Sequence, residues 1–195
     1  MKSALILHGT DSNHASTWFP WLEQELIKLE YKVWVPDLPQ ADQPNIQRYN
    51  DFLLNHSAQF GNWEMSWTYD SESILIGHSS GAVEILGLLN DLSFPDITVK
   101  TCFLVGAFKG DLGWDSLKGM VVDFDYERIK HRSNKFIFIH SDDDPYCPIE
   151  ETLDLCNMVG GKFIELKGQG HFSFEGNPKY DKFPELLEII KAEAA

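Results

Sequence analysis

One serine in this sequence lies between small residues in a pattern suited to nucleophilic catalysis. The run Gly77-His78-Ser79-Ser80-Gly81 follows a short apolar stretch and precedes residues with helical spacing. A serine on a sharp turn from strand to helix has a strained backbone, and small residues two positions before and after it leave room for neighbouring chain. Gly77 and Gly81 provide that room. The pattern predicts that Ser79 is a nucleophile at a helix N-terminus, where developing negative charge is favoured; the alternative is an ordinary glycine-rich turn.

A serine hydroxyl needs a base, and that base needs an acid to orient it. His171 is the candidate base, because Gly168-Gln169-Gly170-His171-Phe172 follows the last expected strand and places an imidazole at the same strand ends as Ser79. His8 ends a strand, and His78 is expected to point away from the site because it flanks the nucleophile. The remaining histidines are expected on the surface or in packing positions: His14, His56, His131 and His140.

The candidate acid is Asp144, which follows the penultimate expected strand. Pro145 and Pro148 stiffen the loop behind this residue, and Pro148 with two following glutamates is typical of a helix start. Asp142 and Asp143 are expected to be solvated loop acids, with a cation site as the competing interpretation. Neither the spacing of a calcium loop nor a histidine or cysteine pair at zinc spacing is present, so no metal is expected.

Stabilisation of a tetrahedral intermediate needs two backbone donors. We expect one to be the N–H of Ser80, directly after the nucleophile. The other is expected from the run His8-Gly9-Thr10 after the first strand, and Thr10 N–H is the choice because the glycine lets the backbone approach a ligand. The chain order Ser79, Asp144, His171 is the order of triads in α/β-hydrolases.

Short apolar runs alternate with stretches of helical spacing along the chain, the pattern of a parallel sheet covered by helices on both faces. We therefore expect an α/β fold, a three-layer α/β/α sandwich in which a single domain spans residues 1–195. The expected strands are 4–7, 33–35, 74–76, 102–105, 136–139 and 163–166. Helices are expected near 18–29 and 46–53, after Ser79, after Pro148 and near 183–190.

Composition excludes several classes of protein. The 195 residues are 43% hydrophobic and 24% charged, which fits a globular domain and neither a disordered nor a fibrous chain. Thirty acidic residues against 16 Lys and Arg give a net charge of −14. Such a surface repels a phosphate backbone or an anionic lipid leaflet. We therefore expect neither nucleic acid nor a membrane as a partner.

The N-terminal region and the cysteines bear on location. The apolar stretch from Ala4 to Leu7 is too short for a secretory signal or a membrane span. Three cysteines, Cys102, Cys147 and Cys156, do not make a closed disulfide framework. A reducing, cytoplasmic location is expected.

Taken together, the motifs resemble the small serine hydrolases of the YdeN and retinoblastoma-binding protein nine family. The resemblance covers essentially the whole chain and is carried by Leu7-His8-Gly9, Trp18-Phe19-Pro20-Trp21-Leu22, the Ser79 motif, Ser141 through Pro148, and Gly170-His171-Phe172. It implies a minimal α/β-hydrolase fold with a reduced parallel sheet of roughly six strands, and a triad of Ser79, Asp144 and His171. Two residues depart from the family pattern: Cys147 replaces the usual valine, and Ser80 replaces leucine or methionine. Ser80 is expected to make the pocket floor more polar.

The resemblance implies hydrolysis of an ester, thioester or amide through an acyl-Ser79 intermediate, with a small-molecule acyl substrate and no cofactor. Residues 107–125 are expected beside the site, where their apolar side chains line an acyl pocket, act as a lid, or simply pack. Trp63 and Trp67 are expected to pack. Two alternatives remain: a binding scaffold of low activity, or a different reaction of the same triad, either acyl transfer to an acceptor other than water or cofactor-free perhydrolysis. Leu155-Cys156-Asn157 does not complete the Leu-x-Cys-x-Glu motif associated with retinoblastoma binding, so no motif supports a protein partner.

Overall fold

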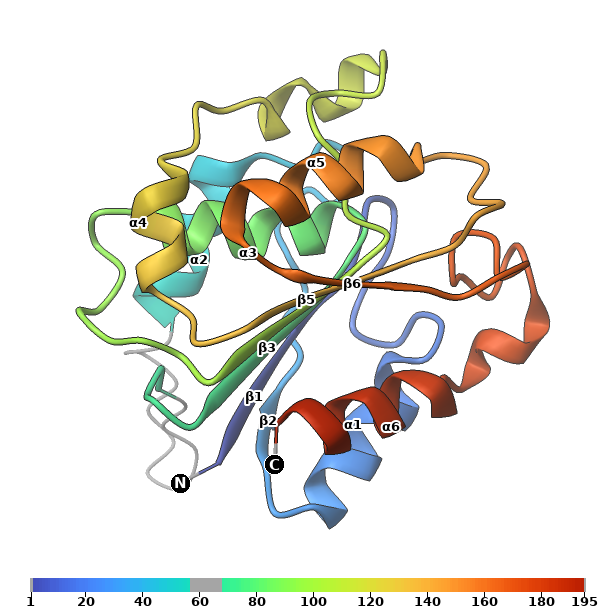
Figure 1. Cartoon of the computed structure of the whole chain (residues 1–195), viewed down its shortest axis with the longest axis horizontal. Helices are drawn as coiled ribbons and strands as arrows, with labels where there is room; N and C mark the ends of the chain where they lie inside the picture. The colour runs from blue at the N-terminus through green and yellow to red at the C-terminus, as the bar shows by residue number, and fades with distance from the viewer. Residues whose placement is uncertain (1, 57–67, 195) are drawn as a thin grey trace.

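The computed structural model describes residues 2–56 and 68–194, and within them a parallel sheet of six strands forms the centre (Figure 1). In sheet order the strands are β2 (Lys32–Trp34), β1 (Ser3–Leu7), β3 (Ser73–His78), β4 (Thr101–Val105), β5 (Phe136–His140) and β6 (Lys162–Glu165). Every neighbouring pair is parallel. Each connection must therefore cross a face of the sheet before the next strand begins.

Helices cover both faces of this sheet (Figure 1). On one face lie α1 (Phe19–Lys28) and α6 (Pro184–Glu193), and on the other lie α2 (Ile46–His56), α3 (Ser80–Asn90), α4 (Tyr126–His131) and α5 (Ile149–Val159). Two short 3-10 helices follow β4 and β6, namely η1 (Asp115–Met120) and η2 (Pro178–Asp181). The architecture is the three-layer α/β/α sandwich expected from the sequence.

Consecutive apolar residues in the central strands serve two separate cores. In β1, Ala4 and Ile6 pack in the cluster that includes α1 and α6, whereas Leu5 and Leu7 pack in the cluster that includes α2 and α3. Successive side chains of a strand point to opposite faces, so a strand covered on both sides is apolar at every position. The whole of β1 is buried, whereas the edge strand β2 is only half-buried.

The expected strands and helices are present, with their ends shifted by up to three residues. Trp18 and Pro148 are N-cap residues of α1 and α5 and lie just before the first helical turn. Trp63 and Trp67, which were expected to pack, lie outside the described residues. Within the described ranges, the helices are all too short or too polar to cross a lipid bilayer.

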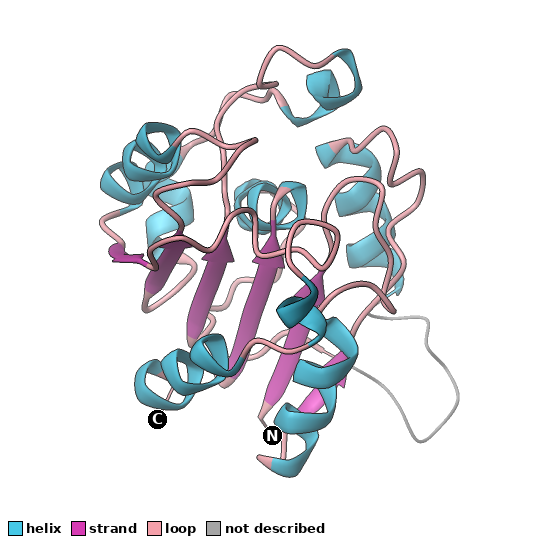
Figure 2. Cartoon of the chain, turned by 90° about the vertical axis from the view of Figure 1, so that its right-hand side faces the viewer, coloured by secondary structure: helices cyan, strands magenta, loops and turns pink. Residues whose placement is uncertain are grey.

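The strand order brings distant loops to one edge of the sheet. From β1 the chain moves outward to β2 and then returns to the other side of β1 to form β3. Such a reversal opens a crevice at the carboxyl ends of the two strands. Thr10 and Ser79 follow β1 and β3, while Asp144 and His171 follow β5 and β6. Figure 2 shows the parallel strands pointing to the same end of the molecule, where these loops gather.

Candidate active site

Ser79 lies at the turn from β3 to α3 and has an uncommon backbone conformation. Its φ of 56° and ψ of −125° lie outside the regions that L residues ordinarily occupy, and such a conformation costs about 1–3 kcal/mol. The Ser79 N–H donates to the carbonyl of Val105 at 2.8 Å, and the Ala82 N–H donates to the Ser79 carbonyl at 2.9 Å. These bonds hold the turn and leave the half-buried Ser79 side chain on the wall of a pocket.

Three glycines let the chain pack closely around Ser79. A Cβ on Gly77 would lie 2.4 Å from the carbonyl oxygen of Gly81, and a Cβ on Gly81 would lie 2.5 Å from the carbonyl oxygen of Leu7. A Cβ on Gly9 would lie 2.9 Å from the Ser79 Cβ. Any side chain at these positions would force backbone apart. The sequence predicted this requirement at Gly77 and Gly81, and Gly9 adds a third close approach, from the loop after β1.

Asp144 and His171 meet in a hydrogen bond. His171 Nδ1 donates to Asp144 Oδ2 at 2.7 Å, while Asp144 Oδ1 accepts the backbone N–H groups of Tyr146 at 2.9 Å and Cys147 at 3.0 Å. Burial raises the pKa of Asp144, but the hydrogen bond and charge of His171, together with the two amides, outweigh it and hold this pKa below its ordinary value. The ionised carboxylate fixes the proton on Nδ1, which leaves Nε2 as the basic nitrogen of His171.

Two residues that sequence reasoning did not single out contact the His171 ring. Gly106 directly follows β4 with a φ of 60°, and a Cβ there would lie 3.2 Å from His171 Cε1. The Tyr146 ring meets the His171 ring edge to face, with centroids 5.2 Å apart. A glycine immediately after a strand was the available sign for Gly106. Nothing in the sequence marks Tyr146 apart from its place between two prolines.

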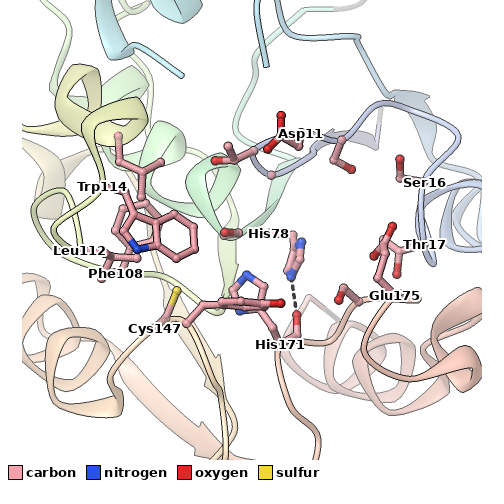
Figure 3. Close-up of a pocket in the computed structure, with 17 residues that line it drawn as sticks. Asp11, Ser16, Thr17, His78, Phe108, Leu112, Trp114, Cys147, His171 and Glu175 are labelled. Carbon is pink, nitrogen blue, oxygen red and sulfur yellow. Dashed lines mark hydrogen bonds between the residues drawn. The ribbon is translucent and has the colours of Figure 1, made fainter. Parts of the chain in front are cut away.

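His78 points toward the site, contrary to the expectation from the sequence (Figure 3). Its ring centroid lies 4.8 Å from that of His171, and its Nε2–H donates to the His171 carbonyl at 2.7 Å. Burial lowers the pKa of His78 to about 3, so the ring is neutral near pH 7. The physical reason is that His78 is the last residue of β3 and packs against Trp18 and Phe19 at the start of α1, beneath the loop that carries His171.

The two loops expected to supply oxyanion donors are tied together by their side chains. Thr10 Oγ1 donates to Ser80 Oγ at 3.0 Å, which joins the loop after β1 to the first turn of α3. Thr10 lines the pocket, whereas Ser80 is 1% exposed and is absent from its wall. The expectation that Ser80 makes the pocket floor more polar is therefore wrong. Its buried hydroxyl instead accepts the hydrogen bond from Thr10 Oγ1.

A cavity of about 360 Å³ opens beside these residues (Figure 3). Its apolar wall consists of Phe108, Leu112, Trp114, Leu117 and Cys147. Its polar wall consists of Asp11, Ser12, Ser16, Thr17, Ser173 and Glu175. Figure 3 shows the rings of His78 and His171 between the two walls.

Residues 107–125 contribute to the core and to the pocket at once. Phe108, Leu117 and Met120 belong to a small cluster of buried side chains. Leu112 and Trp114 extend the same surface into the pocket, although Trp114 is 47% exposed. Both interpretations of this segment, as packing and as pocket lining, therefore apply, and Phe108 and Leu117 do both.

The polar wall contains two acids that sequence reasoning missed. Asp11 and Glu175 are exposed residues that line the pocket, and the described part of its wall contains no lysine or arginine. Exposed acids are common in a chain with 30 Asp and Glu, so nothing in the sequence distinguished these two. They give the mouth of the pocket a negative charge.

Asp142 and Asp143 are exposed, as expected for loop acids, but they are also bonded to the chain. Asp142 Oδ1 accepts the N–H of Gly168 at 2.8 Å, and Asp143 Oδ1 accepts the N–H of Gly170 at 2.7 Å. Both amides precede His171 in the sequence. The two loops that carry the candidate acid and base are therefore bonded to each other.

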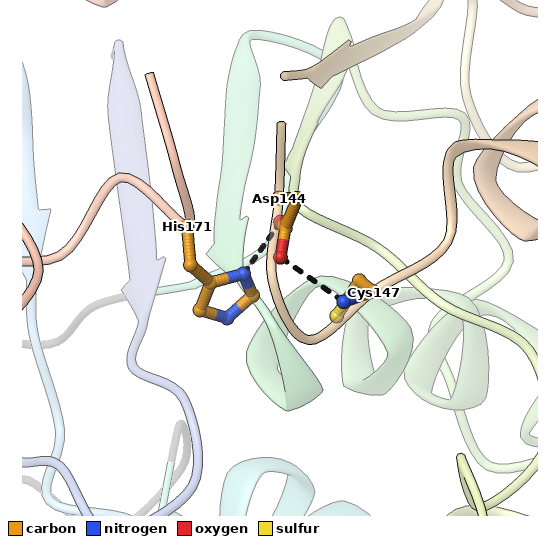
Figure 4. Close-up of side chains that lie close together, drawn as sticks. All are labelled: Asp144, Cys147 and His171. Atoms are coloured by element: carbon orange, nitrogen blue, oxygen red, sulfur yellow. Dashed lines mark hydrogen bonds and ion pairs between the residues drawn. The ribbon is translucent and has the colours of Figure 1, made fainter. Parts of the chain in front are cut away.

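Asp144, Cys147 and His171 form the one group of three metal-ligating side chains in the described ranges, with ligand atoms within 4.8 Å of one another (Figure 4). Metal binding by all three side chains would require a Cys147 thiolate and would compete with the hydrogen bond between His171 and Asp144. Burial raises the pKa of the Cys147 thiol far above its ordinary value, and Nδ1 already donates to Asp144. The arrangement suits a hydrogen-bonded acid and base pair better than a metal.

The other histidines with described side chains, His8, His14, His131 and His140, are absent from the pocket wall. His14 and His131 are exposed, His8 and His140 are buried, and the side chain of His56 lies outside the described residues. His8 Nδ1 donates to the carbonyl of Gly9 at 2.9 Å and Nε2 accepts the N–H of Leu38 at 2.8 Å. This arrangement requires a neutral ring, and burial lowers the pKa of His8 accordingly.

A family profile and a related sequence both identify serine hydrolases as similar to this chain. A profile of the serine hydrolase family matches residues 4–192. The chain is 27% identical over 195 residues to serine hydrolase RBBP9 of Rattus norvegicus, covering 97% of this chain and 94% of the relative.

Solved structures share the fold. The ydeN gene product of B. subtilis has a TM-score of 0.83 at 22% identity, with 99% of this chain and 98% of that chain covered. Est1E from Butyrivibrio proteoclasticus has a TM-score of 0.68 at 13% identity, with 98% and 86% covered. These likenesses establish the α/β-hydrolase fold.

Proposed function

We propose that this chain, which belongs to the serine hydrolase family of the YdeN and RBBP9 type, cleaves a small ester, thioester or amide through an acyl intermediate on Ser79. The family makes the chain a hydrolase. The observation that carries the finer proposal is the 2.7 Å bond between His171 Nδ1 and Asp144 Oδ2, on a pocket whose wall also holds the strained Ser79. We also propose that residues 1–195 form one domain, because the residues of this site come from loops that are spread along the chain from Thr10 to His171.

Acylation starts when His171 Nε2 takes the proton of Ser79 Oγ. The oxygen then forms a bond to the substrate carbonyl carbon, and the π electrons of the carbonyl move onto its oxygen. The N–H groups of Thr10 and Ser80 stabilise this oxyanion. His171 passes its proton to the leaving oxygen, sulfur or nitrogen as the bond between that atom and the carbonyl carbon breaks.

Deacylation repeats these steps with water. His171 Nε2 accepts a proton from water, the hydroxyl attacks the acyl carbon, and Ser79 Oγ leaves with the proton that His171 returns. Asp144 stays ionised throughout, holds the Nδ1 proton and stabilises the imidazolium. Its lowered pKa supports this role, since the carboxylate remains charged well below neutral pH.

The apolar wall supports an acyl group as the part of the substrate bound there. Leu112, Trp114 and Leu117 present apolar surface to a cavity of about 360 Å³, a size that holds a small ligand. A short or medium acyl chain fits this volume. The apolar contacts would bind the chain without any charged group.

The test uses a fluorophosphonate probe and p-nitrophenyl acetate with wild-type protein, Ser79→Ala and His171→Ala. Wild type is expected to be labelled at Ser79 and to hydrolyse the ester, and each variant is expected to lose activity by about 10³-fold or more. Ser93→Ala and His131→Ala are matched controls, because both residues are exposed and lie away from the pocket.

Three outcomes would contradict the proposal. Wild-type turnover by Ser79→Ala would remove this residue as the nucleophile. A folded wild-type protein that resists labelling would favour the binding scaffold. Labelling of Ser79 with product formed only when an alcohol or amine acceptor is added would favour acyl transfer.

A further inference from the structure

The segment before His171 is held by side chains from the loop after β5. Each of three consecutive side chains accepts the N–H of one of three consecutive residues: Asp142 Oδ1 from Gly168 at 2.8 Å, Ser141 Oγ from Gln169 at 2.8 Å, and Asp143 Oδ1 from Gly170 at 2.7 Å. Gly168 and Gly170 have φ values of 68° and 57°. Left-handed residues alternating along a loop turn successive N–H groups toward one side, where they meet an anion.

The clamp, defined as Ser141, Asp142 and Asp143, is also bonded within itself. Ser141 Oγ donates a hydrogen bond to Asp143 Oδ1 at 2.6 Å. The same oxygen therefore accepts one hydrogen bond from the segment and donates one to the aspartate. The bonds from Ser141 and from the Gly170 amide lower the pKa of Asp143. The acceptor is therefore a carboxylate across the pH range of hydrolase assays, and bonds to an ionised acceptor are the stronger kind.

Other contacts hold the far side of the same segment. His78 Nε2 donates to the His171 carbonyl at 2.7 Å, and Trp18 Nε1 donates to the Phe172 carbonyl at 3.0 Å. These bonds come from β3 and from the residue before α1. The clamp alone among these contacts comes from the loop that carries the candidate acid, since Asp143 is the residue directly before Asp144.

We infer that the clamp positions His171 for catalysis by fixing the loop of the base to the loop of the acid. The inference rests on the proposed function, in which His171 is the base and Asp144 orients it. Asp143 and Gly170 each directly precede one partner of the 2.7 Å bond between Asp144 and His171. A bond between these preceding residues therefore fixes the separation of the two side chains. Loss of the clamp would let the imidazole drift from the pocket while the sheet stays intact.

The clamp is expected to act on turnover more than on substrate binding. Its three residues are absent from the wall of the 360 Å³ cavity proposed to hold the acyl group; Asp143 lines a second cavity of about 230 Å³, which shares Tyr146, His171 and Ser173 with the first. Displacement of a reacting group by about 1 Å costs up to about 100-fold in rate. Asp143→Ala is therefore expected to lower kcat for p-nitrophenyl acetate about tenfold or more, to leave KM within about twofold, and to slow labelling of Ser79 by a fluorophosphonate in proportion.

Conservative variants separate hydrogen bonding from charge. Asp143→Asn keeps an oxygen acceptor for the Gly170 amide and is expected to recover most of the kcat lost in Asp143→Ala. Ser141→Ala and Asp142→Ala each remove one acceptor and are expected to lower kcat in the same direction. These two variants keep the inference testable should Asp143→Ala fail to fold.

The control for a merely structural effect is Asp91→Ala. Asp91 Oδ1 likewise accepts a backbone N–H, from Ser93 at 2.7 Å, but at the opposite end of α3 from Ser79. This variant is expected to lower the melting temperature without lowering kcat. Clamp variants that reduce kcat no more than Asp91→Ala, or that raise KM and leave kcat, would overturn the inference.

The same assays separate this inference from the proposed function. If Ser79→Ala is inactive while every clamp variant keeps wild-type kcat, the proposed function stands and the clamp is wrong. If Ser79→Ala keeps wild-type kcat, the nucleophile is wrong and the clamp inference falls with it.

Discussion

At the scale of single residues, the hydrogen bond between Thr10 and Ser80 joins the two proposed oxyanion donors. Thr10 Oγ1 donates to Ser80 Oγ at 3.0 Å, and the backbone N–H groups of both residues are proposed to face the substrate oxygen. An apolar residue at position 80 would not accept this bond. The polar residue at this position is therefore expected to fix the spacing of the donors.

Thr10→Val tests this bond, because valine has nearly the shape of threonine without the hydroxyl. We expect kcat/KM for p-nitrophenyl acetate to fall about tenfold, less than the 100-fold or more that follows loss of an oxyanion donor itself. Ser80→Ala is expected to have a similar effect, and the double variant is expected to be no slower than either single variant, since all three lack the same bond. Fully additive losses would show that the bond is not the cause.

The sequence could predict those residues that are marked by their immediate neighbours in the chain. The sequence singles out Ser79 by its flanking glycines and Asp144 by the prolines that follow it, and the fold places the loops of both at one edge of the sheet. Their roles stay predictions. The expectation that His78 points away from the site was wrong, because the orientation of its ring depends on Trp18 and Phe19, which are far away in the chain.

At the scale of elements, α3 contains a buried acid, Glu84. Glu84 is 0% exposed, and its two carboxylate oxygens have no hydrogen-bond partner among the described residues. Tyr49 on α2, Tyr69 before β3 and Asp91 at the end of α3 are the titratable groups coupled to it. Burial, and then the charge of Asp91, raise the pKa of Glu84 well above its ordinary value of 4.5.

The raised pKa predicts how Glu84 affects stability as pH changes. Below pH 4.5 both the folded and the unfolded chain carry a protonated Glu84; above it the unfolded chain releases this proton while the folded chain keeps it. Stability is therefore lost as pH rises toward the folded pKa, by about 1.4 kcal/mol for each unit of the shift. Glu84→Gln stays neutral, so its free energy of unfolding is expected to gain on wild type as pH rises from 4.5 to 8.

Urea unfolding across this pH range measures the difference between the two proteins. Glu188→Gln is the control, because Glu188 is an exposed residue on α6 that pairs with Lys191. Its free energy of unfolding is expected to track wild type. A difference between Glu84→Gln and wild type that stays flat with pH would contradict the burial of an uncharged Glu84.

The spacing of apolar residues predicted the helices and strands, but it did not predict the structure of residues 107–125. Helices with one buried face, such as α1 and α6, have apolar residues at helical spacing. In contrast, α3 is buried over nearly its whole surface, so spacing gave no sign that Glu84 lies inside. Residues 107–125 contain only the short η1 and pack against Ile46 and Val83 from distant elements, contacts that no local period encodes.

At the scale of the whole molecule, the order of apolar runs predicted the sheet and both helical layers, because a strand covered on two faces has no polar side. The net charge of −14 carries no information about this fold. The net charge bears on substrate preference only when it is considered together with the pocket, whose described wall includes Asp11 and Glu175 and no lysine or arginine. The net charge of the chain and the charge of the pocket wall therefore have the same sign.

This common sign predicts a preference for cationic substrates. Butyrylcholine is expected to give a kcat/KM several-fold above that of its neutral analogue 3,3-dimethylbutyl butyrate at about 0.02 M salt, and this ratio is expected to shrink at about 0.5 M salt, because ions screen charges beyond a few ångströms. Asp11→Asn with Glu175→Gln is expected to reduce the low-salt ratio. Asp96→Asn with Glu188→Gln removes as much charge from residues outside the pocket wall and is expected to reduce it less. Equal reductions by both pairs would assign the preference to net charge alone, and an unchanged ratio with salt would contradict it altogether.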